Sequence, residues 1–345
     1  RKMSAIQKNV KGLLLCLVIA VPSWFLGKMF PVIGGAVIAI VAGMVTTVFW
    51  KDKNSFAPGI TFTSKKILQW AVVLLGFGMD LGVVFQTGKQ SLPIIVCTIT
   101  TSLVLSFVLH KAMDIPSKIS TLVGVGSSIC GGSAIAATAP VIDADDEEVA
   151  QAISVIFFFN VLAAILFPIF GQMIGFDTTS GEAFGVFAGT AVNDTSSVTA
   201  AASTWDSMWG LGSQTLDKAV TVKLTRTLAI IPITLVLAFL RTRKASENGE
   251  NKVSMKQIFP FFILYFIAAS VITTVAVQSG ISANVFAPVK ELSKFFIVLA
   301  MAAIGLNTDI VKLVKTGGKP LVMGACCWAG ITAVSLFLQH LMHIW

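Results

Sequence analysis

Hydrophobic runs follow one another along nearly the whole chain, separated by short polar segments. A helix needs about 20 mostly apolar residues to cross the hydrocarbon core of a bilayer, and most of these runs approach that length. In lipid every backbone polar group must be satisfied internally, so the runs predict helices. We therefore expect an all-α polytopic membrane protein, with residues 1–345 forming a single transmembrane domain.

The pattern predicts about eleven transmembrane helices. They are expected at residues 12–29, 32–50, 67–85, 92–110, 119–142, 149–174, 184–203, 219–240, 258–277, 295–314 and 321–344. Composition agrees, because 55% of the 345 residues are hydrophobic and 12% are charged. A soluble domain usually has about 25% charged residues.

The positions of Lys and Arg predict the orientation, because these residues collect in cytoplasmic loops. They favour a cytoplasmic N-terminus, an external C-terminus and a cytoplasmic loop at about residues 241–256. The acidic run 143–148 then falls outside. The segment 184–203 is short and polar, but as a re-entrant hairpin it would place the loop 241–256 outside, so we expect it to cross.

Two segments resemble each other and suggest an internal repeat. Residues 78–92 and 305–321 each follow an apolar run and contain an acid and a Thr-Gly turn with Lys. In the expected topology they run in opposite directions, and inverted repeats are typical of secondary transporters. Chance similarity between Gly-rich segments is the alternative. Asp80, Asp309 and Asn160 are secondary candidates for function, with helix ends as the alternative for the two Asp residues.

A glycine- and serine-rich stretch interrupts the run 119–142. Irregular backbone at membrane depth is tolerated where it lines a cavity or is buried in protein. We expect non-helical backbone around Gly131–Ser133 that faces a cavity, with a break after Gly131–Gly132 that opens a half-helix near Ser133 and attracts anions. Close packing through small residues is the alternative. The candidate residues here are Ser127, Ser128, Cys130, Gly131, Gly132 and Ser133.

Two further polar clusters are candidates. The first contains Asn193, Asp194, Thr195, Ser196 and Ser197, with a helix cap as the alternative. The second is the pair Lys223 and Arg226, which share one helical face. This pair would bind an anion and would be offset by Asp194 when empty, whereas snorkelling to the outer interface is the alternative.

Four motifs resemble the YeiH family, whose members are named as sulfate exporters. They are residues 128–137, residues 188–198, the Lys223/Arg226 pair and residues 300–306. Members commonly have His where this chain has Asn193, so a titrating role there is absent. That family is grouped with the bile acid, arsenite and riboflavin transporter superfamily and the cation–proton antiporter clan. The resemblance implies inverted repeats and two broken, crossing helices, the second around Gly305–Asn307, which adds Asn307 to the site.

These observations favour a secondary transporter that moves a small anion, sulfate or organosulfonate-like by the family resemblance, across the bacterial inner membrane by alternating access. An anion channel or gated pore is the alternative and would need a continuous polar stripe. We expect no enzyme, cofactor or metal site, because the polar segments contain no His and the Cys residues lack metal-ligand spacing. Expected partners are the anion, a coupling ion (proton or sodium) and the bilayer, with a homodimer as a candidate assembly and no nucleic acid.

Overall fold

The computed structural model describes residues 5–30, 35–211, 214–247 and 261–345, and all regular secondary structure in these residues is helical. The prediction of an all-α protein is confirmed. The helices are α1 (Ala5–Met29), α2 (Gly35–Phe49), α3 (Ala57–Phe62), α4 (Leu68–Leu75), α5 (Leu81–Met113), α6 (Ser117–Ser128), α7 (Gly132–Ile142), α8 (Asp146–Ile174), α9 (Glu182–Ala191), α10 (Thr195–Trp209), α11 (Gln214–Thr227), α12 (Ile230–Glu247), α14 (Phe261–Gln278), α15 (Ala287–Leu306), α16 (Ile310–Thr316) and α17 (Gly318–Leu341).

Uninterrupted helices of spanning length are fewer than the sequence pattern suggests. Within the described residues, five are long and apolar enough to cross a membrane, and a sixth is obtained if α15 and α16, bent by 85°, count as one span. The expected spans 67–85, 119–142 and 184–203 are each divided by a turn or loop. Helix-capping residues start new helices at such breaks: Asp80 accepts a hydrogen bond from the N–H of Gly82 in the first turn of α5, and Asp309 accepts one from Val311 in the first turn of α16.

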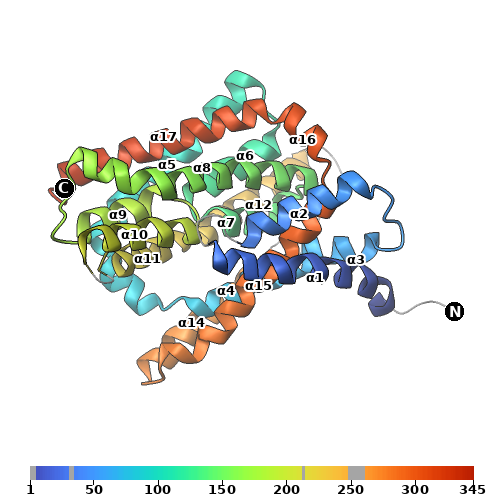
Figure 1. Ribbon diagram of the computed structural model, residues 1–345, viewed down its shortest axis with the longest axis horizontal. Helices are drawn as coiled ribbons and strands as arrows, with labels where there is room; N and C mark the ends of the chain where they lie inside the picture. The colour runs from blue at the N-terminus through green and yellow to red at the C-terminus, as the bar shows by residue number, and fades with distance from the viewer. Residues whose placement is uncertain (1–4, 31–34, 212–213, 248–260) are drawn as a thin grey trace.

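The helices form two groups. In the first group α15 packs against α1, α2 and α4, and α14 also packs on α4. In the second group α5 lies along α6 and α17, while α9, α10 and α11 pack together beside α8 and α17. Figure 1 shows α8 and α17 running along the long axis, with α14 and α15 oblique to them at the lower edge. The second group contains the two divided segments that form the candidate site.

The first divided segment, α6 and α7, is a helical hairpin. At its open end the Lys118 ammonium near the start of α6 donates to the carbonyl of Asp143 just after α7, at 2.7 Å. The backbone reverses at residues 129–131, where Gly131 has a φ of +67°, a conformation that suits glycine. The prediction that 119–142 passes from one side to the other is therefore wrong, because the chain returns to where it started.

The second divided segment, α9 and α10, is also a hairpin. The rings of Phe184, near the start of α9, and Trp205, near the end of α10, stack with centroids 4.4 Å apart. Near the end of α10 the carboxylate of Asp206 accepts hydrogen bonds from the N–H groups of Thr215 and Leu216, both at 3.0 Å. The open end of this second hairpin therefore lies beside the start of α11, and its apex is formed by residues 192–194.

The open ends of the two hairpins lie at opposite ends of the molecule. Residues 214–247 of α11 and α12 form one stretch long enough to span a membrane. The second hairpin opens beside Thr215 at its start, whereas the Asp143 carboxylate of the first hairpin lies 3.7 Å from the Arg241 guanidinium near its end. Figure 1 shows α9, α10 and α11 close to the C-terminus and α3 and α16 toward the other end.

The acidic run 143–148 lies on the same side as the basic residues from which it was expected to be separated. Besides the contact between Asp143 and Arg241, the Glu147 carboxylate pairs with the Lys312 ammonium at 2.7 Å. The prediction that 143–148 and Arg241 face opposite sides is wrong. The reason is the first hairpin, which uses about a helix length of apolar chain without crossing.

Candidate functional site

The apices of the two hairpins meet in the interior. A Cβ atom added to Gly131 would lie 3.4 Å from the Cα and Cβ atoms of Asp194, and also 3.4 Å from Nδ2 of Asn160 on α8. The first apex (residues 129–131) therefore touches the second apex (residues 192–194), with a residue of α8 beside both. The element that meets the first apex is thus α9–α10. The chain does break near Asn307, where α15 and α16 are bent by 85°, but Asn307 contacts Asp146, so the prediction that this break supplies the second half of the site is wrong.

Helix α11 brings two cations to these apices. Lys223 and Arg226 are three residues apart, so their side chains leave the same face of the helix. Close packing of α11 on α9 directs this face inward, since a Cβ at Gly189 of α9 would lie 2.7 Å from Cβ of Val222. The side chains of Lys223 and Arg226 are 1% and 0% exposed. The alternative that they snorkel to the interface is wrong.

Arg226 joins the C-terminal ends of α6 and α9. Its Nε and Nη2 atoms donate to the carbonyls of Ser128 at 2.6 Å and Ser127 at 2.7 Å. Its Nη1 donates to the Thr190 carbonyl at 2.8 Å, and Nη2 also reaches Oδ1 of Asn193 at 3.1 Å. The planar guanidinium, with donors on several edges, is suited to bridging two backbone segments in this way.

Lys223 completes the same arrangement. Its ammonium donates to the carbonyls of Ile129 at 2.8 Å and Val192 at 3.3 Å, and also to the carbonyl of Asn193. The last carbonyls of a helix have no partner within the helix and carry partial negative charge. The two cations therefore neutralise the negative ends of α6 and α9, and Asp194 lies close enough to Lys223 to interact with it electrostatically.

The first turns of α7 and α10 lead away from the same apices. Helix α7 follows Gly131 with no side-chain cap in the described residues, and α10 follows Asp194. The predicted half-helix near Ser133 is confirmed, beginning at Gly132. The irregular residues are 129–131, so the prediction of non-helical backbone at Gly132 and Ser133 is wrong. Gly132 faces protein, because a Cβ there would lie 3.1 Å from Cζ of Phe157.

The remaining candidates separate into those at the apices and one elsewhere. Cys130 is buried beside Gly131, and Ser197 is buried in the first turn of α10. The side chains of Thr195 and Ser196 lie outside the described part of the structure. Asn307 hydrogen-bonds to the Asp146 carboxylate at the start of α8, so its contacts lie away from the apices.

Asn160 is the site residue that the sequence analysis left out of its main set. Its Oδ1 atom accepts a hydrogen bond from the backbone N–H of Asn193 at 3.1 Å. The available signal was an amide in the middle of the mainly apolar run 149–174, whose other amides, Gln151 and Gln172, lie near its ends, and polar groups at mid-membrane depth are usually functional. The position of Asn160 in the sequence does not show which backbone segment its side chain contacts in the fold.

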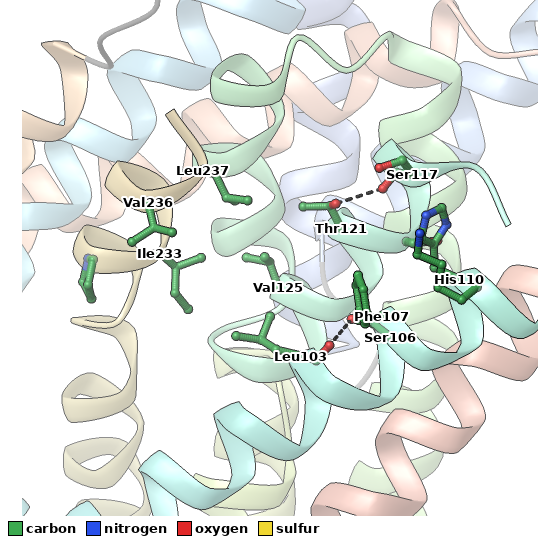
Figure 2. Close-up of a pocket in the computed structure, with 13 residues that line it drawn as sticks. Leu103, Ser106, Phe107, His110, Ser117, Thr121, Val125, Ile233, Val236 and Leu237 are labelled. Atoms are coloured by element: carbon green, nitrogen blue, oxygen red, sulfur yellow. Dashed lines mark hydrogen bonds between the residues drawn. The ribbon is translucent and has the colours of Figure 1, made fainter. Parts of the chain in front are cut away.

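A cavity of about 420 Å³ lies to one side of the first hairpin, between α5, α6 and α12 (Figure 2). Leu103, Phe107, Val125, Ile233 and Val236 contribute apolar side chains to its lining. Two of the hydroxyls that also line it, on Ser106 and Thr121, bond to carbonyls of their own helices, as in the bond from Thr121 to the Ser117 carbonyl at 2.8 Å drawn in Figure 2. His110 and Lys111 also line the cavity, but most of its wall is apolar and neither apex reaches it, so it is not the candidate site.

Comparison with known proteins places this architecture in a family. Residues 11–324 match the family model described as "Conserved hypothetical protein 698". A UPF0324 membrane protein of Streptococcus mutans is 58% identical over 346 residues, which cover 99% of this chain and 100% of the relative. The chain belongs to the UPF0324 membrane protein family.

Other UPF0324 proteins match over similar lengths. One from Fusobacterium nucleatum is 55% identical over 349 residues, covering 98% of this chain and 99% of the relative. One from Streptococcus pyogenes serotype M6 is 56% identical over 344 residues, covering 99% and 100%. These names describe UPF0324 relatives as membrane proteins without a substrate, so the YeiH, superfamily and clan assignments stay predictions.

Proposed function

We propose that this UPF0324 protein is a secondary transporter, and not an enzyme, that moves a small anion across the bacterial inner membrane by alternating access. The observation that supports this most strongly is the meeting of two opposed helical hairpins around the buried Lys223 and Arg226. Broken helices whose ends converge at mid-membrane are a recurrent way to build substrate sites in secondary transporters. Backbone that leaves regular helix at this depth is acceptable because protein surrounds it.

In this proposal both hairpins are re-entrant, one from each side of the membrane. The crossing elements are then α1, α2, α3–α4, α5, α8, α11–α12, α14, α15 and α17. Turning two expected crossings into hairpins removes an even number of passages, so the N-terminus stays cytoplasmic and the C-terminus external. The loop at 241–256 also stays inside, in agreement with its positive charge.

The electrostatics at the apices favour an anion. Lys223 and Arg226 cancel the negative ends of α6 and α9, so the uncompensated dipole ends are the positive first turns of α7 and α10. The two cations also offset the negative charge of Asp194 nearby. An anion between the two first turns would meet backbone N–H groups from both hairpins.

The contacts between the two helix groups support a carrier that alternates. On one side Asp146 of α8 accepts hydrogen bonds from Asn307, after α15, and from Ser64, which lies between α3 and α4. Next to it, Glu147 of α8 pairs with Lys312 of α16. These polar contacts can break and reform in water as the groups move, and we call them the α8 latch. The tight packing at Gly131 opposes an open pore.

Flux into proteoliposomes tests the proposal. Purified protein should carry at least one of radiolabelled sulfate, an organosulfonate, phosphate or nitrate, and unlabelled anion on the opposite side should accelerate exchange. Proton and sodium gradients applied separately would identify the coupling ion, and crosslinking in the membrane would test the homodimer. If none of the probes is transported, the proposed function is refuted. If a probe is transported but anion on the opposite side does not accelerate its flux, the result supports the channel alternative.

A further inference from the structure

The Asn160 side chain has a fixed orientation. Its two terminal atoms differ in hydrogen bonding, since Oδ1 accepts and Nδ2 donates. The neighbouring group is the backbone N–H of Asn193, a donor, so the atom that faces it at 3.1 Å must be Oδ1. Nδ2 therefore points away from that bond. The side chain is 1% exposed, and Nδ2 has no hydrogen-bond partner in the described residues.

The free amide nitrogen lies at the junction of the two apices. It is 3.4 Å from the position that a Cβ of Gly131 would occupy, and that position is also 3.4 Å from Cα of Asp194. Gly131 immediately precedes α7, and Asp194 immediately precedes α10. The unsatisfied donor and the two helix N-termini thus converge on one small region.

A buried donor without a partner is costly, at about 1–3 kcal/mol. Leu in place of Asn would remove this unpartnered donor but would leave the buried N–H of Asn193 without its acceptor. Lys223 and Arg226 have no free donor to offer a ligand, because the N–H groups that the structure describes point at backbone carbonyls and at Oδ1 of Asn193. Among the described residues Nδ2 of Asn160 has no acceptor, so it is available to a partner from outside the chain.

We propose that Asn160 donates through Nδ2 to a compact oxyanion held between the first turns of α7 and α10, and that it selects oxyanions over halides. The inference rests on the proposed function and names the ligand chemistry of that site. An amide nitrogen carries two N–H donors in fixed directions. Together with the N–H groups of two helix starts it matches a multi-oxygen anion such as sulfate, whereas a spherical halide has no directional acceptors to use them.

The test compares two substitutions in purified protein. Asn160→Asp keeps Oδ1 for the Asn193 N–H but replaces the donor with a charged oxygen. Thr138→Val is the matched control, because Thr138 on α7 also has a buried, unpartnered polar atom but lies about two turns beyond the apex. The readouts are the stabilisation of the protein against thermal unfolding by sulfate and by chloride, and sulfate flux.

We expect Asn160→Asp to weaken sulfate binding on the order of tenfold or more, and Thr138→Val to behave as wild type. Asn160→Leu, which has no added charge, should narrow the preference for sulfate over chloride. If wild type responds to none of the probes, the proposed function fails. If wild type responds and Asn160→Asp binds sulfate as Thr138→Val does, or Asn160→Leu keeps the full preference, the assignment of Asn160 fails while the transporter proposal stands.

Discussion

Removing the Arg226 side chain should uncouple the two hairpins. In Arg226→Ala the carbonyls of Ser127, Ser128 and Thr190 lose their side-chain donor inside a packed region. A hydrogen bond to a charged group contributes about 1.5–3 kcal/mol, and loss of one partner from a buried ionic arrangement costs roughly 3–5 kcal/mol. Since the cost of burying the guanidinium disappears too, we expect a net loss of about 3 kcal/mol.

The measurement is thermal unfolding of the purified protein in detergent, with sulfate flux as a second readout. We expect the Tm of Arg226→Ala to fall by at least about 5 °C and its flux to be lost. Arg226→Lys should be intermediate, because one ammonium keeps the charge but cannot span both hairpins with a planar fork.

An exposed arginine provides the control. Arg243 has a side chain that is 68% exposed and pairs with Glu247 one turn away on α12. Such surface pairs contribute about 0–1 kcal/mol, so Arg243→Ala should leave the Tm within about 2 °C of wild type. A Tm for Arg226→Ala equal to that of the Arg243 control would show that the carbonyls are satisfied without the guanidinium, and our account of the apices would be wrong.

Three further predictions test other parts of the structure. Gly131→Ala should destabilise by about 1–3 kcal/mol, because it forces a side chain into a left-handed conformation against the second apex, and an unchanged Tm would contradict this. In a cysteine-free background, Cys at positions 143 and 247 should both react with a membrane-impermeant thiol reagent from the cytoplasmic side, and labelling from opposite sides would exclude the first hairpin. Asn307→Ala and Asp146→Ala, combined in a double-mutant cycle, should be non-additive in exchange rate, because each breaks the same contact of the α8 latch, whereas full additivity would argue against it.

Much of the local structure could be predicted from the sequence. Runs of apolar residues require helices wherever lipid or protein replaces water, so the fold class follows from the pattern alone. The spacing of Lys223 and Arg226 places both on one helical face, and the depth of the pair in an apolar run points to a buried role. The glycines near residue 131 likewise indicate a break, because such a run does not sustain a regular helix facing lipid.

The direction of the chain after each break depended on the tertiary structure. A crossing helix with a kink and a returning hairpin have the same local pattern, and they differ in distant contacts such as Phe184 on Trp205. The distribution of positive charge could not correct the predicted number of crossings. Replacing two crossings by two hairpins changes the side of the segment between the hairpins only, and every loop after the second hairpin stays on its predicted side. That segment carries the acidic run 143–148, which is why its side was predicted wrongly.

The composition of the site also required the fold. The partners of Lys223 and Arg226 are mainly backbone carbonyls at two helix ends, and every residue has a carbonyl, so no residue type marks these positions. Asn160 reaches the apices because α8 packs against both hairpins. The sequence alone determined which residues are polar at membrane depth, and only the tertiary structure decided which of them meet, because hydrogen bonds act over about 3 Å whereas these residues are separated by tens of positions along the chain.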